Sequence, residues 1–274
     1  MRSRDPNPPI PPLLRGVAWI EVAVLLLAGG GLFFLSDAAQ VAWPWPIEPF
    51  NALFLGAVFL ASLAAVGMLV VYPRWAPARL LLPMIFVFTA LFLLVSLIYP
   101  QRFEFERWAT YGWYAVYLGL PAVAVYGLYR YRNLPSPVQY PTPPRWRRLL
   151  LANAVIMGLY GFAMFAAPMR LTAFWPWDID AFHGRLYSVV FTTIAVGGLG
   201  LAHFAAPVER LTLGLGYAVL GLFSVFSVFI ADASQHAVNW SAPGVWLWLA
   251  IFGLEFVLGL DLIAWSSDQR PVER

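Results

Sequence analysis

Residues 43–71 read WPWPIEPFNALFLGAVFLASLAAVGMLVV, a Trp-Pro-Trp segment followed directly by an apolar run. A helix of about 20 apolar residues, rising roughly 1.5 Å per residue, is long enough to cross the roughly 30 Å hydrocarbon layer of a bilayer. The run lacks the alternation of apolar and polar residues that is typical of barrel strands. The sequence therefore predicts a transmembrane helix that satisfies its own backbone groups.

Similar apolar runs occur along the whole chain, and they predict an all-α, polytopic membrane protein of about eight transmembrane helices. Pro83 and Pro121 fall inside two of these runs and are expected to kink their helices. The predicted spans are residues 13–35, 50–72, 80–99, 112–129, 149–167, 186–203, 211–231 and 244–264.

The composition supports a membrane protein and excludes several kinds of function. The 274 residues are 61% hydrophobic and 11% charged, whereas soluble domains carry about 25% charged residues. Cysteine and lysine are both absent, which excludes thiol catalysis, Cys-ligated metals, Schiff-base lysines and Walker A loops. The arginines are dispersed among apolar runs, so no nucleic-acid partner is expected. The expected partner is the lipid bilayer, other membrane proteins are a further candidate, and the sequence leaves any cofactor undetermined.

The arginines also predict the orientation of the helices. All arginines except Arg102, Arg107, Arg170 and Arg185 fall on one side of the predicted bundle. By the positive-inside rule this side is the cytoplasm. The sequence therefore predicts a multi-pass protein of the bacterial inner membrane with both termini cytoplasmic.

The Trp-Pro-Trp segment occurs twice. Residues 43–50 read WPWPIEPF, and residues 175–182, 132 positions later, read WPWDIDAF. The same shift relates Trp108 to Trp240 and Gly112 to Gly244. The sequence thus predicts a duplication, with repeats at residues 1–132 and 145–274 joined by a Pro-rich cytoplasmic linker at residues 133–144. Because each repeat has an even number of spans, the repeats are expected to be parallel and related by a pseudo-two-fold axis along the membrane normal.

The pattern Trp-Pro-Trp-x-Ile-x-x-Phe, leading into a span with small residues, resembles a segment of multi-spanning membrane proteins of GC-rich bacteria. The resemblance covers only the region around each pair of tryptophans, and Phe50 and Phe182 stand where a leucine is expected. It implies a membrane protein and brings no activity with it.

Two carboxylates within predicted spans are candidates for a ligand-binding or proton-linked role. Glu21 and Glu255 both lie deep in the bilayer under the predicted topology, where a carboxylate is costly and by default marks a functional site. The duplication places Asn153 at the position of Glu21, so these two side chains could share a hydrogen bond across the axis. The alternatives are structural hydrogen bonding, which for Glu21 and Asn153 would join the repeats, and an error in the predicted span boundaries.

Two external groups are further candidates. Trp43, Trp45, Trp175 and Trp177 are expected to anchor the protein at the membrane interface or to form flaps that stack on an aromatic or cationic ligand. His183, His236, Asp180 and Asp232 could form a nitrogen and oxygen metal site, with solvated loop residues as the alternative.

The expected function is transport or binding of a small molecule in a central cavity between the repeats. The alternative is a non-catalytic accessory or scaffold subunit of a larger membrane complex. An enzyme acting on a lipid or isoprenoid substrate is less favoured, because neither a nucleophile motif nor an H-E-x-x-H motif occurs.

Overall fold

The computed structural model describes residues 7–134, 140–236 and 238–267, and within these ranges the chain is helical with no strands. Several of the long helices begin with a proline in their first turn, where its missing N–H costs no hydrogen bond. The elements are α1 (Pro12–Phe34), α2 (Ser36–Ala42), α3 (Pro49–Val71), α4 (Trp75–Ile98), the 3-10 turn η1 (Pro100–Arg102), α5 (Trp108–Tyr131), α6 (Pro144–Ala166), α7 (Pro168–Leu171), α8 (Ala181–His203), α9 (Pro207–Gln235) and α10 (Pro243–Ser267).

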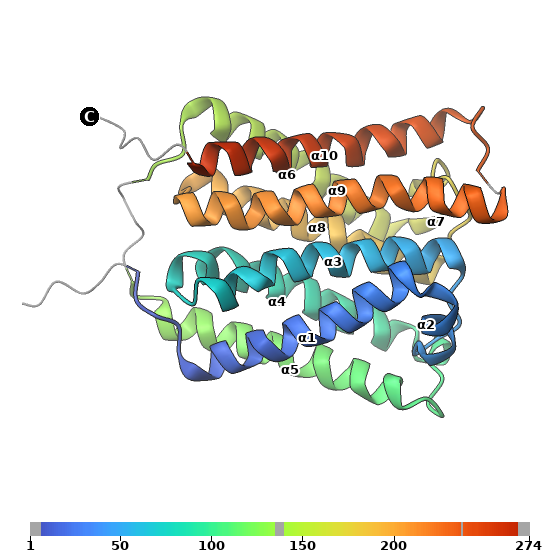
Figure 1. The fold of residues 1–274 in the computed structure, drawn as a ribbon, viewed down its shortest axis with the longest axis horizontal. Helices are drawn as coiled ribbons and strands as arrows, with labels where there is room; N and C mark the ends of the chain where they lie inside the picture. Colours follow the sequence, from blue (N-terminus) through green and yellow to red (C-terminus); the bar gives the residue numbers. More distant parts are fainter. Residues whose placement is uncertain (1–6, 135–139, 237, 268–274) are drawn as a thin grey trace, which may run out of the picture.

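Seven helices in the described ranges are long and apolar enough to cross a membrane, namely α1, α3, α4, α6, α8, α9 and α10. The remaining predicted span, residues 112–129, corresponds to α5, which is not among the seven although it is 24 residues long. Its many tyrosines and tryptophans are less apolar than the leucines and valines of the other helices, which explains the difference. Figure 1 shows α5 running alongside the other long helices.

The long helices pack as four hairpins, which pair α1 with α3, α4 with α5, α6 with α8, and α9 with α10. Contacts between α3 and α9 and between α4 and α8 then join the hairpins into two rows. One row is α10, α9, α3, α1, which Figure 1 shows from top to bottom, and the other is α6, α8, α4, α5. Each row therefore combines helices from both halves of the sequence.

Glycine permits a very close helix approach between α1 and α3. A Cβ atom added at Gly56 would lie 2.8 Å from the backbone nitrogen of Phe33, closer than real Cβ contacts come. Such small-residue contacts bring the backbones of membrane helices together.

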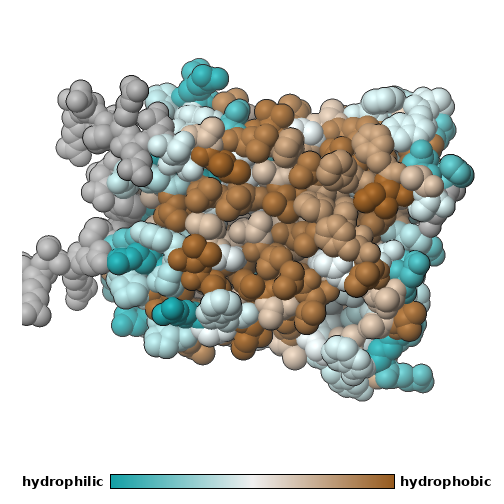
Figure 2. Space-filling model, viewed as in Figure 1, coloured by the Kyte–Doolittle hydropathy of each residue, from teal (hydrophilic) through white to brown (hydrophobic). Residues whose placement is uncertain are grey.

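The surface carries an apolar band between two polar ends, as Figure 2 shows for one face. Large apolar side chains of the long helices are exposed, including Leu27, Phe162 and Leu254. A contiguous apolar belt of this size is unstable in water, so the protein fits a lipid bilayer. Figure 1 places the start of α1 and the end of α10 at the same end of the bundle, and α2 and α7 at the opposite end.

Candidate binding cavity

A cavity of about 920 Å³ lies in the part of the bundle where α1 and α5 face each other. Residues of α3 and α4 form its floor, and α8 and α9 contribute one edge. The volume is near the upper end of the roughly 300–1,000 Å³ that is typical of ligand pockets. The cavity is not centred between the sequence halves as expected, because most of its walls come from the first half.

The shape of the cavity follows from how α1 and α5 lie. Near the start of α1, the side chain of Leu14 packs close to Gly127 of α5, and an apolar cluster around Leu81 closes this end. Toward α2 the two helices diverge, as Figure 1 shows. Ile20, Leu27 and Trp108 line the cavity and are also exposed, so the cavity opens sideways on the outer, lipid-facing surface.

The walls are almost entirely apolar, and most of the hydroxyl groups that line them already donate hydrogen bonds to backbone carbonyls. This holds for Ser62, Thr89, Thr193, Thr212 and Tyr217. Two polar side chains of the described lining make no such hydrogen bond. Glu21 of α1 and Tyr117 of α5 line the cavity, interact electrostatically with each other, and make no hydrogen bond within the described residues.

Aromatic rings form the wall at the end near α2. Trp43, Phe59 and Trp113 line the cavity there, and the ring centroids of Trp43 and Trp113 are 5.9 Å apart. The side chain of Trp45 lies behind them and packs on Trp113 with the centroids 4.8 Å apart. Trp45 is only 1% exposed, and Trp43 and Trp175 are also buried. These rings therefore pack inside the bundle.

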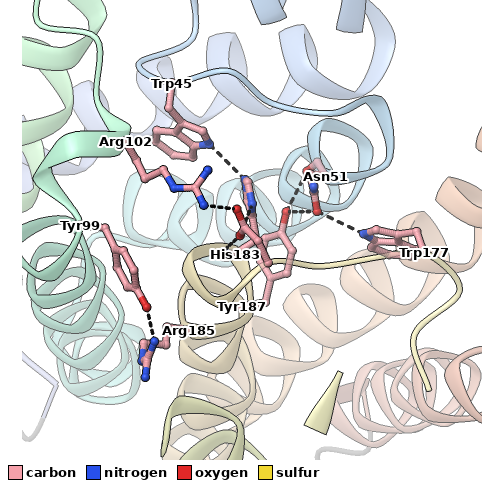
Figure 3. A network of polar contacts seen from close by, with 9 residues as sticks. Trp45, Asn51, Tyr99, Arg102, Trp177, His183, Arg185 and Tyr187 are labelled. Atoms are coloured by element: carbon pink, nitrogen blue, oxygen red, sulfur yellow. Dashed lines mark hydrogen bonds and ion pairs between the residues drawn. The ribbon is translucent and has the colours of Figure 1, made fainter. Parts of the chain in front are cut away.

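Trp45 also belongs to a polar network at this end of the molecule (Figure 3). Its indole Nε1 donates to Nε2 of His183 at 3.2 Å, and Nδ1 of His183 lies 2.9 Å from Oδ1 of Asp180. Because an indole N–H can only donate, Nε2 is the acceptor and Nδ1 carries the proton toward Asp180. Asp180 also caps α8 by accepting from the His183 amide, and it pairs with Arg102 at 2.8 Å.

The surroundings of Asp180 favour its charged form. Burial by itself raises the pKa of this carboxyl group, but the hydrogen bonds from the ring and amide of His183 and the charge of Arg102 outweigh that effect. The pKa is lowered from 3.8 to about 2. Asp180 therefore remains a carboxylate at neutral pH and fixes the ring of His183.

A second set of contacts mirrors the first. The indole Nε1 of Trp177 donates to Oδ1 of Asn51 at 3.1 Å, and the hydroxyl of Tyr187 donates to the same oxygen at 2.9 Å (Figure 3). In both sets a tryptophan of one half reaches the first turn of a helix of the other half. Asn51 is the polar residue that sequence reasoning overlooked, although it is a lone amide at the start of an apolar run.

The other carboxylate candidate lies outside the cavity. Glu255 of α10 is 2% exposed, and the side chain of Asn153 on α6 lies close to its carboxyl group. Oε2 of Glu255 and Nδ2 of Asn153 each lack a well-aligned hydrogen-bond partner in the described residues. Asn153 thus lies near Glu255 within the second half, and not near Glu21 across the molecule.

The four candidate metal ligands are not brought together. His183 and Asp180 form the pair described above, while Asp232 accepts from the indole of Trp240 at 2.7 Å. His236 is exposed and ends α9 with a φ of 50°. Within the described ranges, no group of three or more histidine, aspartate or glutamate side chains could hold a metal ion.

Comparison with known proteins gives no relatives. No family model, no curated protein and no solved structure matches this chain.

Proposed function

We propose that this protein binds a small apolar molecule in the cavity between α1 and α5. The observation that carries the proposal is the cavity itself, which is large, apolar and open to the lipid-facing surface, with two polar groups in its lining that lack hydrogen bonds within the described residues. Binding sites for small molecules typically combine apolar walls with a few convergent polar groups. The apolar walls favour binding of a hydrophobic molecule over passage of a polar solute.

We also propose that the chain consists of two parallel repeats with eight spans, at residues 1–132 and 145–274, in the bacterial inner membrane with cytoplasmic termini. Equivalent contacts support the repeats. The hydrogen bonds from Trp45 to His183 and from Trp177 to Asn51 are related by the shift of 132 residues. A Cβ atom at Gly29 would lie 3.0 Å from the nitrogen of Leu60, and one at Gly161 would lie 2.9 Å from that of Thr192.

The segments that lead into α1 and α6 support the same proposal. An isolated antiparallel bridge joins Pro9 to Arg74, and another joins Pro141 to Phe204. Pro9 and Pro141 are 132 residues apart, and each precedes the first long helix of its half. Repeats copied in parallel are expected to show such equivalent contacts.

Comparison of equivalent positions explains why the first half is hollow. The cavity is lined by Ala28, Ala42, Ala115 and Gly119. The equivalent residues 132 positions later are Tyr160, Phe174, Leu247 and Ile251. Tyr160 packs its ring on Phe191 with centroids 4.7 Å apart and accepts a hydrogen bond from Trp175. Larger side chains thus stand at the equivalent positions of the second half, and Tyr160 packs there against its neighbours.

Cavity-filling variants that copy residues of the second half into the first test this function. In Ala28→Tyr and Gly119→Ile, a larger side chain should fill the cavity and weaken binding of 1-pyrenemethanol, an apolar fluorescent alcohol, by at least about tenfold. Energy transfer from tryptophan to pyrene in nonionic detergent measures the binding. Gly67→Ile is the matched control, because the space around Gly67 is as open as that around Gly119 but Gly67 lies outside the cavity.

Equal affinity in the filled variants, the control and the native protein, or no binding to any of them, would overturn the proposal. The accessory-subunit alternative would then gain support if the protein were isolated from native membranes in a stable complex with other membrane proteins.

A further inference from the structure

We infer that the ligand is a lipophilic amine, with an apolar body in the cavity and a protonated nitrogen at Glu21. This inference rests on the proposed function and adds the chemical class of the ligand. It follows from the charge in the cavity, the hydrogen-bond capacity of its walls, the aromatic rings and the lateral opening.

The ionisable lining of the cavity is acidic, with no basic side chain among the described residues to pair with it. Glu21 is the one carboxyl group among the described residues that line it, and these residues include no arginine and no histidine. A carboxyl group in an apolar membrane interior is either neutral or paired with a cation, and within the described part of the chain Glu21 has no ion pair. A cationic ligand supplies the missing charge.

The polar groups that line the cavity favour a ligand that donates hydrogen bonds. The Glu21 carboxylate accepts, and the hydroxyl of Tyr117 on the facing helix can accept as well as donate. A protonated amine has only donors, so it matches both groups at once. Charge-assisted hydrogen bonds of this kind are about twice as strong as neutral ones.

The aromatic rings suit the same ligand. Phe59, Phe88, Trp113 and Tyr117 line the cavity together with Glu21. Aromatic faces attract cations that lie within about 6 Å of the ring centre, and they also stack on flat apolar groups. The wall therefore favours a cationic head and an aromatic or alicyclic body.

The position of the cavity opening determines how a ligand enters. Because the cavity opens between α1 and α5 on the apolar surface, a ligand reaches it from the bilayer and not from water. Amphiphilic amines concentrate in bilayers, since their apolar bodies are buried there. The inferred ligand is thus available where the cavity opens.

A pair of probes that differ in one group tests the inference, namely 1-pyrenemethylamine and 1-pyrenemethanol. The native protein should bind the amine more tightly than the alcohol. Glu21→Gln should weaken binding of the amine roughly 10- to 100-fold, as expected for a lost charge-assisted hydrogen bond, and should leave binding of the alcohol within about twofold. Asp261→Asn, which removes an exposed carboxylate of α10 outside the cavity, should change neither affinity.

The outcomes separate the two proposals. If Glu21→Gln binds both probes as the native protein does, or if the native protein prefers the alcohol, the amine inference is wrong and the apolar binding site stands. If neither probe binds to the native protein, both proposals fail. Binding of the alcohol to Glu21→Gln also shows that this variant is folded.

Discussion

At the scale of single residues, the two tryptophan contacts at the end near α2 show how a repeated pattern can differ in chemistry. Trp45 and Trp177 occupy equivalent positions, yet one donates to the ring of His183 and the other to the amide oxygen of Asn51. Only the histidine is linked on to a carboxylate, Asp180. The second half therefore has a charged contact, with Arg102, that the first half lacks at the equivalent place in the described residues.

Replacement of Asp180 by asparagine should make the protein less stable at neutral pH. The folded state lowers the pKa of Asp180 from 3.8 to about 2, so the carboxylate stabilises the fold at pH values above about 4. Because the side chain is about one-third exposed, we expect a loss of about 1 kcal/mol at pH 7 in Asp180→Asn.

The pH dependence of the stability difference between the native protein and Asp180→Asn tests this prediction. The stabilisation should disappear as the pH falls from about 4 to about 2, because the native carboxyl group then becomes protonated as well. Thermal unfolding in detergent, followed by the fluorescence of the 13 tryptophans, measures the difference. A stability difference that does not change over this pH range would contradict the assignment.

At the scale of helices, close packing depends on a few small residues. Gly56 of α3 faces the backbone of Phe33 on α1, whereas the space around Gly30 of α1 is open. The two glycines therefore provide a matched pair, since an added methyl group meets a neighbour in one case and nothing in the other.

Gly56→Ala should destabilise the protein by about 1–3 kcal/mol, because the new methyl group forces α1 and α3 apart. Gly30→Ala should be neutral or stabilising by up to about 1 kcal/mol, as alanine favours a helix. The apparent unfolding temperatures of the two variants measure this contrast. Similar temperatures for both would show that α1 and α3 approach less closely than described.

Much of this arrangement of helices was predictable from sequence. Seven of the predicted spans correspond to helices that are long and apolar enough to cross a membrane, because long apolar runs have few other solutions in lipid. The short helices α2 and α7 were not predicted, since seven and four residues carry too little periodicity. Pro83 and Pro121 do lie inside helices, where the sequence placed them.

The candidate site was harder to predict. Glu21 stood out because a carboxylate is rare in an apolar run, and the structure places it in the cavity. Three other features of the site depend on which helices become neighbours. Tyr117 lies on the helix that faces Glu21, Asn153 lies away from Glu21, and His236 lies away from His183. A repeat pattern specifies equivalent positions, but it does not specify that α3 packs on α9 and α4 on α8.

At the scale of the whole molecule, the topology can be tested because the native chain contains no cysteine. Glu106 and Asn133 are exposed residues on either side of α5. If α5 crosses the membrane in the proposed orientation, Glu106→Cys should react with a membrane-impermeant maleimide in cells whose inner membrane is intact. Asn133→Cys should react only after that membrane is permeabilised.

Reaction of both cysteines under the same condition would show that α5 does not cross the bilayer, and the eight-span proposal would fail. Reversed accessibility would retain the eight spans but invert the orientation. The unmodified chain gives the background of each labelling reaction.

The interleaving of the hairpins also has a consequence for biosynthesis. The face of α3 that packs on α9 is complete only when α9 has left the ribosome, and α9 lies in the second half of the chain. Because translation proceeds at about 5–20 residues per second, the hairpin of α1 and α3 spends several seconds in the membrane before α9 is synthesised. Proteins that shield newly inserted helices would act during this interval, so depletion of a membrane insertase should lower the yield of this protein more than that of a bundle whose helices pack in sequence order.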